Sequence, residues 1–176
     1  VSLQARGLPE DRRDELRFVE EHVQAMAAAY RIVRVTARTV EVVLADLVTD
    51  VVDSLRQIAK QPRDIVALEL TTGARVVRID QAIAMGLYLA TMVPPYLDCT
   101  AANGGLLHIA VAALDHEWIR LSVMQPGLAR PPSQNLLRQR LTKIYLSQLG
   151  AEIDPSAEPG VTQVKIHIPP RQPAGE

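Results

Sequence analysis

The chain has 176 residues and a mass of 19.3 kDa, enough for one domain with a small appendage. Nineteen Lys and Arg residues nearly balance 20 Asp and Glu residues, so the sequence offers no broad basic face for nucleic acid or anionic lipid. Hydrophobic residues make up 48% but aromatic residues only 3%, which predicts an aliphatic core and excludes base-stacking platforms. The single cysteine, Cys99, excludes an internal disulfide and is typical of the reducing cytoplasm, where we expect the protein.

Residues 10–33 carry the strongest helical periodicity in the sequence. Apolar residues recur there at steps of three and four, as in a helix that packs against another helix. Pro9 and the acidic residues after it favour a helix start at this point. Residues 1–7 resemble the end of an earlier helix, so residues 1–35 are predicted to be the C-terminal part of a helical hairpin. The apolar positions are Leu16, Val19, Val23, Met26, Tyr30 and Val33.

This apolar stripe leaves two alternatives open. A long exposed stripe commonly pairs two chains, which predicts a homodimer. The simpler alternative is one helix packed within a monomer. No apolar run reaches the roughly 18 residues of a membrane span, and no signal peptide opens the sequence. Because the first residue is Val1, we expect that further sequence precedes this fragment.

The segment after the first helix predicts a mixture of strands and helices. Residues 39–43 favour a short strand, and residues 46–59 favour a helix with one apolar face. Residues 65–70 and 75–79 are predicted to pair as a β-hairpin around a turn at Gly73.

The next predicted helix begins with Asp80 as its cap. The adjacent Pro94 and Pro95 are expected to break or kink this helix, because proline cannot donate a helical hydrogen bond. Residues 106–114 and 118–123 are rich in strand-forming residues and are separated by a short polar connection, so they predict a hairpin.

The C-terminal part predicts one more helix and the last strands. Ser133 is the expected cap of this helix and Gly150 its C-terminal stop. Residues 152–153 and 161–168 are predicted to close a sheet, and residues 170–176 form a loose tail. The residues expected to face inward from the helix are Leu137, Leu141, Ile144, Tyr145 and Leu149.

These elements predict an α+β chain in which a helical dimerisation hairpin precedes an α/β two-layer sandwich at residues 36–169. The order resembles the cytoplasmic core of two-component sensor histidine kinases, closest to the HWE-type and related groups, in which the sandwich is the ATP-binding domain. Five segments carry the resemblance: SLQAR at 2–6, VQAMA at 23–27, DQAIAMGL at 80–87, QLGA at 148–151 and GVT at 160–162.

The resemblance implies a phospho-accepting histidine on the first dimerisation helix, at a position upstream of Val1. None of the four histidines in the chain is a convincing replacement. His22 lies beside the apolar stripe, His108 and His167 lie in predicted strands, and His116 lies on a turn. We therefore predict no catalytic residue and no metal site in this chain.

The resemblance also implies an acidic residue and an asparagine on the ATP-binding helix, which orient the attack and hold magnesium. The matching positions hold Ala90, Thr91 and Pro95. Alanine and proline have no side-chain oxygen for a metal ion. Cys99 falls at the family's basic or histidine position and is interpreted as a packing residue.

A second family element, an aspartate followed by spaced glycines, recognises adenine. The corresponding run keeps only Gly127, because Gln125 replaces the aspartate and Ala129 the second glycine. The glycine-rich turn that wraps the phosphates falls at residues 136–138, where there is no glycine, so side chains are expected to fill the space of the phosphates.

These substitutions predict a degenerate sensor histidine kinase core, a pseudokinase without a cofactor that docks a response regulator or a partner kinase. The expected contact with a receiver domain lies at Arg17, Glu21 and Gln24. Three alternatives stay open. The chain could be an active histidine kinase that binds ATP and magnesium in a divergent pocket, a phosphotransfer or phosphatase module whose histidine precedes Val1, or a dimeric scaffold unrelated to phosphotransfer.

Overall fold

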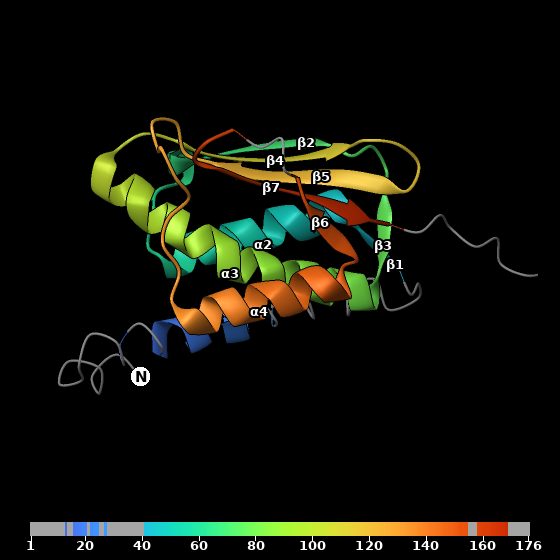
Figure 1. Ribbon diagram of the computed structural model, residues 1–176, viewed down its shortest axis with the longest axis horizontal. Coiled ribbons are helices and arrows are strands. Elements are labelled where there is room, and N and C mark those ends of the chain that lie inside the picture. The colour runs from blue at the N-terminus through green and yellow to red at the C-terminus, as the bar shows by residue number, and fades with distance from the viewer. Residues whose placement is uncertain are drawn as a thin grey trace, which may run out of the picture.

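A computed structural model of the chain describes residues 13, 16–20, 22–24, 27, 41–154 and 158–168 (Figure 1). The described residues from Arg13 to Ala27 are helical, and we call this segment the N-terminal helix. The other helices are α2 (Leu44–Ile58), α3 (Ile79–Asn103) and α4 (Leu136–Gln148), with a 3₁₀ turn at Arg63–Ile65. The strands are β1 (Glu41–Val43), β2 (Val66–Thr71), β3 (Val76–Arg78), β4 (Leu107–Ala113), β5 (Trp118–Met124), β6 (Ala151–Ile153) and β7 (Val161–His167). The start of the predicted hairpin, residues 1–12, and the predicted tail, residues 170–176, lie outside the described residues.

Five strands form the main sheet, in the order β2-β4-β5-β7-β6. β2 runs parallel to β4, and the other neighbouring strands are antiparallel. α2 and α3 cover one face of this sheet, and α4 packs against α3 (Figure 1). β1 and β3 form a separate two-stranded sheet. This arrangement confirms the predicted α+β fold with a helical layer on a sheet.

The core between the sheet and the helices is aliphatic, as the composition predicts. Alternate residues of β4, including Ile109 and Val111, are fully buried, while their neighbours on the other face are partly exposed. α2 contributes Leu47, Val51 and Leu55, each no more than 1% exposed, at the spacing of one helical face. Burying each such side chain contributes about 1.5–3 kcal/mol, so this layer of branched residues accounts for much of the stability.

The predicted hairpin of residues 65–70 and 75–79 is wrong. β2 pairs with β4, with Leu68 opposite Ile109, whereas β3 pairs with β1. Gly73 does adopt a turn conformation, with φ of 61°. A turn does not determine which strand a segment joins. Parallel pairing with β4 places the apolar residues of β2 beside the buried apolar residues of β4.

The predicted break of α3 at its two prolines is also wrong, because the helix continues through them to its end. Pro94 and Pro95 lack N–H groups, so the carbonyls one turn earlier, those of Ala90 and Thr91, lose their helical donors. Arg138 supplies the replacement, because its Nη1 lies 3.5 Å from the first carbonyl oxygen and 3.3 Å from the second. The helix therefore tolerates both prolines.

Two helix starts differ from the sequence prediction. The N-cap of α3 is Arg78, and Asp80 lies within the first turn. The N-cap of α4 is Asn135 and not Ser133, because the Asn135 side chain accepts a hydrogen bond of 2.8 Å from the backbone N–H of Arg138. The cap places Arg138 in the first turn of α4.

The buried face of α4 is rotated relative to the prediction. Tyr145 and Leu149 are buried as expected, but Leu137 and Ile144 are 41% and 49% exposed. Arg138, which is only 5% exposed, takes the inward position. Arg138 faces inward because the carbonyls of Ala90 and Thr91 on α3 require a hydrogen-bond donor, which a leucine cannot supply.

The turn before β7 is fixed by a close backbone contact at Gly160. Its φ is 82°, and a Cβ at this position would clash with the carbonyl oxygen of Leu128. The Tyr96 hydroxyl donates to the Gly160 carbonyl over 3.2 Å and lies 2.8 Å from Thr162 Oγ1, which links α3 to the same turn. The loop after β5 is thereby held against the start of β7.

We expect Gly160→Ala to destabilise the protein more than Gly127→Ala. Both glycines have positive φ, which costs an alanine roughly 1–2 kcal/mol, but Gly127 has open space at its Cβ position. The clash at Gly160 adds about 1–3 kcal/mol for overpacking. Urea unfolding of the two variants measures the difference, and equal losses would contradict the close contact.

Candidate functional site

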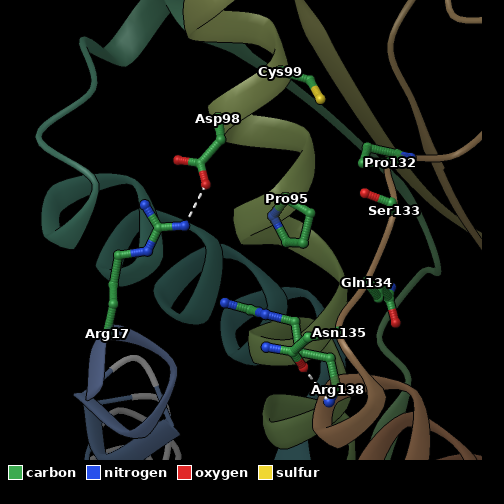
Figure 2. Close-up of a pocket in the computed structure, with 9 residues that line it drawn as sticks. All are labelled: Arg17, Pro95, Asp98, Cys99, Pro132, Ser133, Gln134, Asn135 and Arg138. Carbon is green, nitrogen blue, oxygen red and sulfur yellow. Dashed lines mark hydrogen bonds and ion pairs between the residues drawn. The ribbon is translucent and has the colours of Figure 1, made fainter. Parts of the chain in front are cut away.

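A cleft of about 480 Å³ lies beside the C-terminal half of α3 and the start of α4 (Figure 2). The N-terminal helix borders its outer side. Its lining combines guanidinium, carboxylate, hydroxyl and amide groups with apolar surface from two prolines. The residues that line it are Arg17, Pro95, Asp98, Cys99, Pro132, Ser133, Gln134, Asn135 and Arg138.

Arg138 connects three helices at the inner end of this cleft. Its guanidinium donates to the α3 carbonyls of Ala90 and Thr91, as described above. The same group lies over the ring of Phe18 in the N-terminal helix, with 4.5 Å between its Cζ and the ring centroid. A planar guanidinium suits both tasks, because it donates at its edge and stacks through its face.

Further interactions join the described residues of the N-terminal helix to the rest of the protein. Arg17 Nη2 donates to Asp98 Oδ2 of α3 over 2.6 Å, and Figure 2 shows this pair across the mouth of the cleft. Phe18 is only 2% exposed. The His22 ring lies 4.1 Å from the Phe18 ring and 6.0 Å from that of Tyr145 on α4.

His22 is the titratable group most affected by this contact. Burial lowers the pKa of His22, a hydrogen bond with the Phe18 carbonyl partly opposes that effect, and the positive charge of Arg138 lowers the pKa further. Burial alone raises the pKa of the neighbouring Tyr145, which stays neutral at ordinary pH. The imidazole therefore favours its neutral form here.

The structure places the predicted positions of the ATP-binding helix around Arg138. Ala90 and Thr91 are fully buried, and the Thr91 hydroxyl donates to the Tyr88 carbonyl over 2.6 Å. Pro95 lines the cleft. These three residues therefore lie together, but only Pro95 faces the cleft.

The predicted adenine-recognition residues lie outside the cleft lining. Gln125 is 4% exposed, its Nε2 donates to the Gly104 carbonyl over 3.4 Å, and its Oε1 is buried without a partner among the described residues. Gly127 and Ala129 are exposed in the loop after β5. The amide is turned into the protein, toward the end of α3.

The predicted docking residues divide into three cases. Arg17 is paired with Asp98, Gln24 is exposed, and Glu21 lies outside the described residues. Exposed Gln24 thus remains available to a partner, whereas the Arg17 guanidinium already contacts α3.

Among the described residues, no three His, Cys, Asp or Glu side chains lie close enough together to hold a metal ion. His108 and His167 lie on β4 and β7 as predicted, and His116 lies in the exposed turn between β4 and β5. No described helix is long and apolar enough to cross a membrane.

Sequence reasoning missed Arg138, which proves to be the central residue of the site. The sequence does hold a signal for it. Two adjacent prolines in an otherwise regular helix require a donor for the carbonyls one turn earlier, and the residues that supply such a donor from a distance are Arg and Lys. Which of the 19 basic residues does so depends on how α4 packs.

We expect Arg138→Met to lower the free energy of unfolding by about 2–6 kcal/mol, since two buried carbonyls lose their donors at about 1–3 kcal/mol each. Arg138→Lys should lower the free energy of unfolding by an intermediate amount, because an ammonium group lacks the planar set of donors of a guanidinium and does not stack on an aromatic ring. Arg140→Met, at an exposed position of the same helix, should change stability by less than about 0.5 kcal/mol. Urea unfolding distinguishes the variants, and equal effects at positions 138 and 140 would contradict the role of Arg138.

No protein-family model and no curated protein matches the chain. Solved structures do match it. The histidine kinase domain of the Erythrobacter litoralis EL346 blue-light activated histidine kinase superposes with a TM-score of 0.63 at 18% identity, covering 86% of this chain and 74% of that one. A longer structure of the same kinase gives 0.66 at 19% identity, and the match covers 85% of this chain but only 53% of the kinase. The resemblance inferred from the sequence is thus confirmed in its architecture: the chain has the fold of a histidine kinase domain.

Proposed function

We propose that this chain is the core of a degenerate sensor histidine kinase, a pseudokinase that serves a two-component system by binding a partner. The observation that carries the proposal is the position of Arg138. Sequence resemblance aligns the first turn of α4 with the glycine-rich turn that wraps the phosphates of ATP. In this chain an arginine from that turn reaches α3 and bonds to two of its carbonyls.

The three family positions on α3 do not supply ligands for the magnesium of a nucleotide complex. Magnesium prefers carboxylate and carbonyl oxygens with room for water. Ala90 and Pro95 offer no side-chain oxygen, and the Thr91 hydroxyl is buried and already bonded within α3. The nearby guanidinium of Arg138 also repels a cation.

The position predicted to recognise adenine, Gln125, supports the same conclusion. An aspartate in the family's position accepts a hydrogen bond from the amino group of adenine. Gln125 instead directs its amide into the fold, where Nε2 donates to Gly104. Its side chain therefore bonds to the backbone at the end of α3 and does not face a ligand.

The exposed side of the N-terminal helix supports a homodimer. Leu16, Val19 and Val23 are 46%, 53% and 57% exposed, while Phe18 on the other side of the helix is buried against the rest of the protein. Apolar residues at this spacing favour pairing with another helix. A second copy of the chain is the partner that the proposal assigns to this stripe, with a receiver domain docking beside it near Gln24, in the cytoplasm.

We expect no saturable heat when ATP with magnesium is titrated into the purified protein, and no shift of its melting temperature at millimolar nucleotide. A ligand that binds only the folded state raises its stability in proportion to the logarithm of ligand concentration. A histidine kinase domain known to bind ATP, titrated under the same conditions, is the positive control. Saturable binding at micromolar concentration would overturn the proposal and favour the alternative of an active kinase with a divergent pocket.

We expect Val23→Glu to convert the dimer into a monomer, because a carboxylate in an apolar helix pair loses its hydration. Gln24→Glu adds the same charge at the adjacent exposed position, outside the stripe, and should leave the dimer intact. Sedimentation velocity at several protein concentrations measures the change. A parent protein that stays monomeric at tens of micromolar, or equal effects of the two variants, would contradict pairing through this stripe.

A further inference from the structure

The contact between the N-terminal helix and α4 contains a histidine with one unused ring nitrogen. His22 Nδ1 lies 3.1 Å from the Phe18 carbonyl oxygen. A carbonyl can only accept, so Nδ1 carries the hydrogen and Nε2 of the neutral ring is an acceptor. Nε2 is buried and has no hydrogen-bond partner among the described residues.

The surroundings of this ring suit a neutral imidazole and not an imidazolium. On its own helix the ring faces Phe18, and on α4 it faces Tyr145 and Arg138. The carboxylate that joins this helix to α3, that of Asp98, is bonded to Arg17. A second proton on Nε2 would therefore be buried without an acceptor and close to the guanidinium of Arg138.

Detachment of the helix from α4 would remove both costs of protonating His22, which are the buried N–H without an acceptor and the nearby charge of Arg138. The imidazolium would then be hydrated, and its distance from Arg138 would increase. Above pH 7 these penalties do not matter, because the ring is neutral in either arrangement. The protonation of one side chain thus favours one arrangement of the helix over the other, which is the requirement for a switch.

We propose that this contact is a proton-sensitive clamp: neutral His22 holds the N-terminal helix against α4, and protonation of Nε2 releases it. The proposal does not depend on the loss of nucleotide binding. It concerns how the helix that carries the apolar stripe is attached to the sandwich domain.

The direction of the pH dependence follows from proton linkage. Burial, opposed in part by the Phe18 carbonyl and reinforced by Arg138, lowers the pKa of His22 below its usual value of 6.5 in the attached state. The attached state then binds fewer protons than the detached state. Attachment is strongest above pH 6.5 and weakens as the pH falls below it, by at most about tenfold per pH unit for one proton. The loss stops once the pH is below the lowered pKa.

The test measures the distance between the two helices as a function of pH. Spin labels are attached at Gln24→Cys on the N-terminal helix and Ser147→Cys on α4, both exposed positions, in a Cys99→Ser background. Dilution with excess unlabelled protein restricts the measured distances to pairs within one chain. We expect one short distance at pH 8 and a growing longer component between about pH 6.5 and 5.5 that disappears when the pH is raised again.

Two variants separate His22 from other titrating groups. His22→Phe keeps an aromatic ring but cannot be protonated, so the short distance should persist down to pH 5.5. His116→Gln removes an exposed histidine in the turn between β4 and β5 and should keep the pH response. Far-UV circular dichroism shows whether the sandwich stays folded over the same range.

Three results would overturn the clamp. The first is a parent protein whose distance does not change between pH 8 and 5.5. The second is a pH-dependent change of distance that also occurs in His22→Phe, whether by detachment or by unfolding. Such a result would show that groups other than His22 cause the change. The third is an imidazole of His22 that titrates at or above pH 6.5 in an NMR titration of the parent protein.

Discussion

A pair of prolines inside a buried helix is the constraint on which the rest of the molecule depends. Pro94 and Pro95 leave two carbonyls of α3 without helical donors, and a buried polar group without a partner costs about 1–3 kcal/mol. Arg138 satisfies both carbonyls with one planar group. Because this arginine must point inward, α4 lies with its arginine against α3 and turns Leu137 toward solvent.

The same guanidinium determines what packs on its other side. Its face lies over Phe18, so the N-terminal helix is attached at the point where α3 and α4 meet. The pair of Arg17 and Asp98 adds a second attachment at the mouth of the cleft. Arg138 therefore holds the N-terminal helix, α3 and α4 together at one point.

The sequence was sufficient to predict the elements but not all of their partners. The apolar face of α2, the strands β4 and β5 and the order of helices and strands follow from local periodicity, which reports burial directly. The pairing of β2 with β4 does not, because several strands could cover the same apolar residues. For the site, the interpretation of Ala90, Pro95 and Gln125 as a degenerate nucleotide pocket stays a prediction. The role of Arg138 depends on the rotation of α4, which periodicity indicated incorrectly.

The parallel pairing of β2 with β4 also affects the order in which the sheet assembles. β4 and β5 are joined by a short turn, so they meet at little entropic cost. β2 reaches β4 only after the connection at residues 72–106, which includes α3. Closing so long a loop costs about 2 kcal/mol more than closing the short turn. The central hairpin is therefore expected to form early, and the β2 edge to join it only once α3 has folded across the sheet.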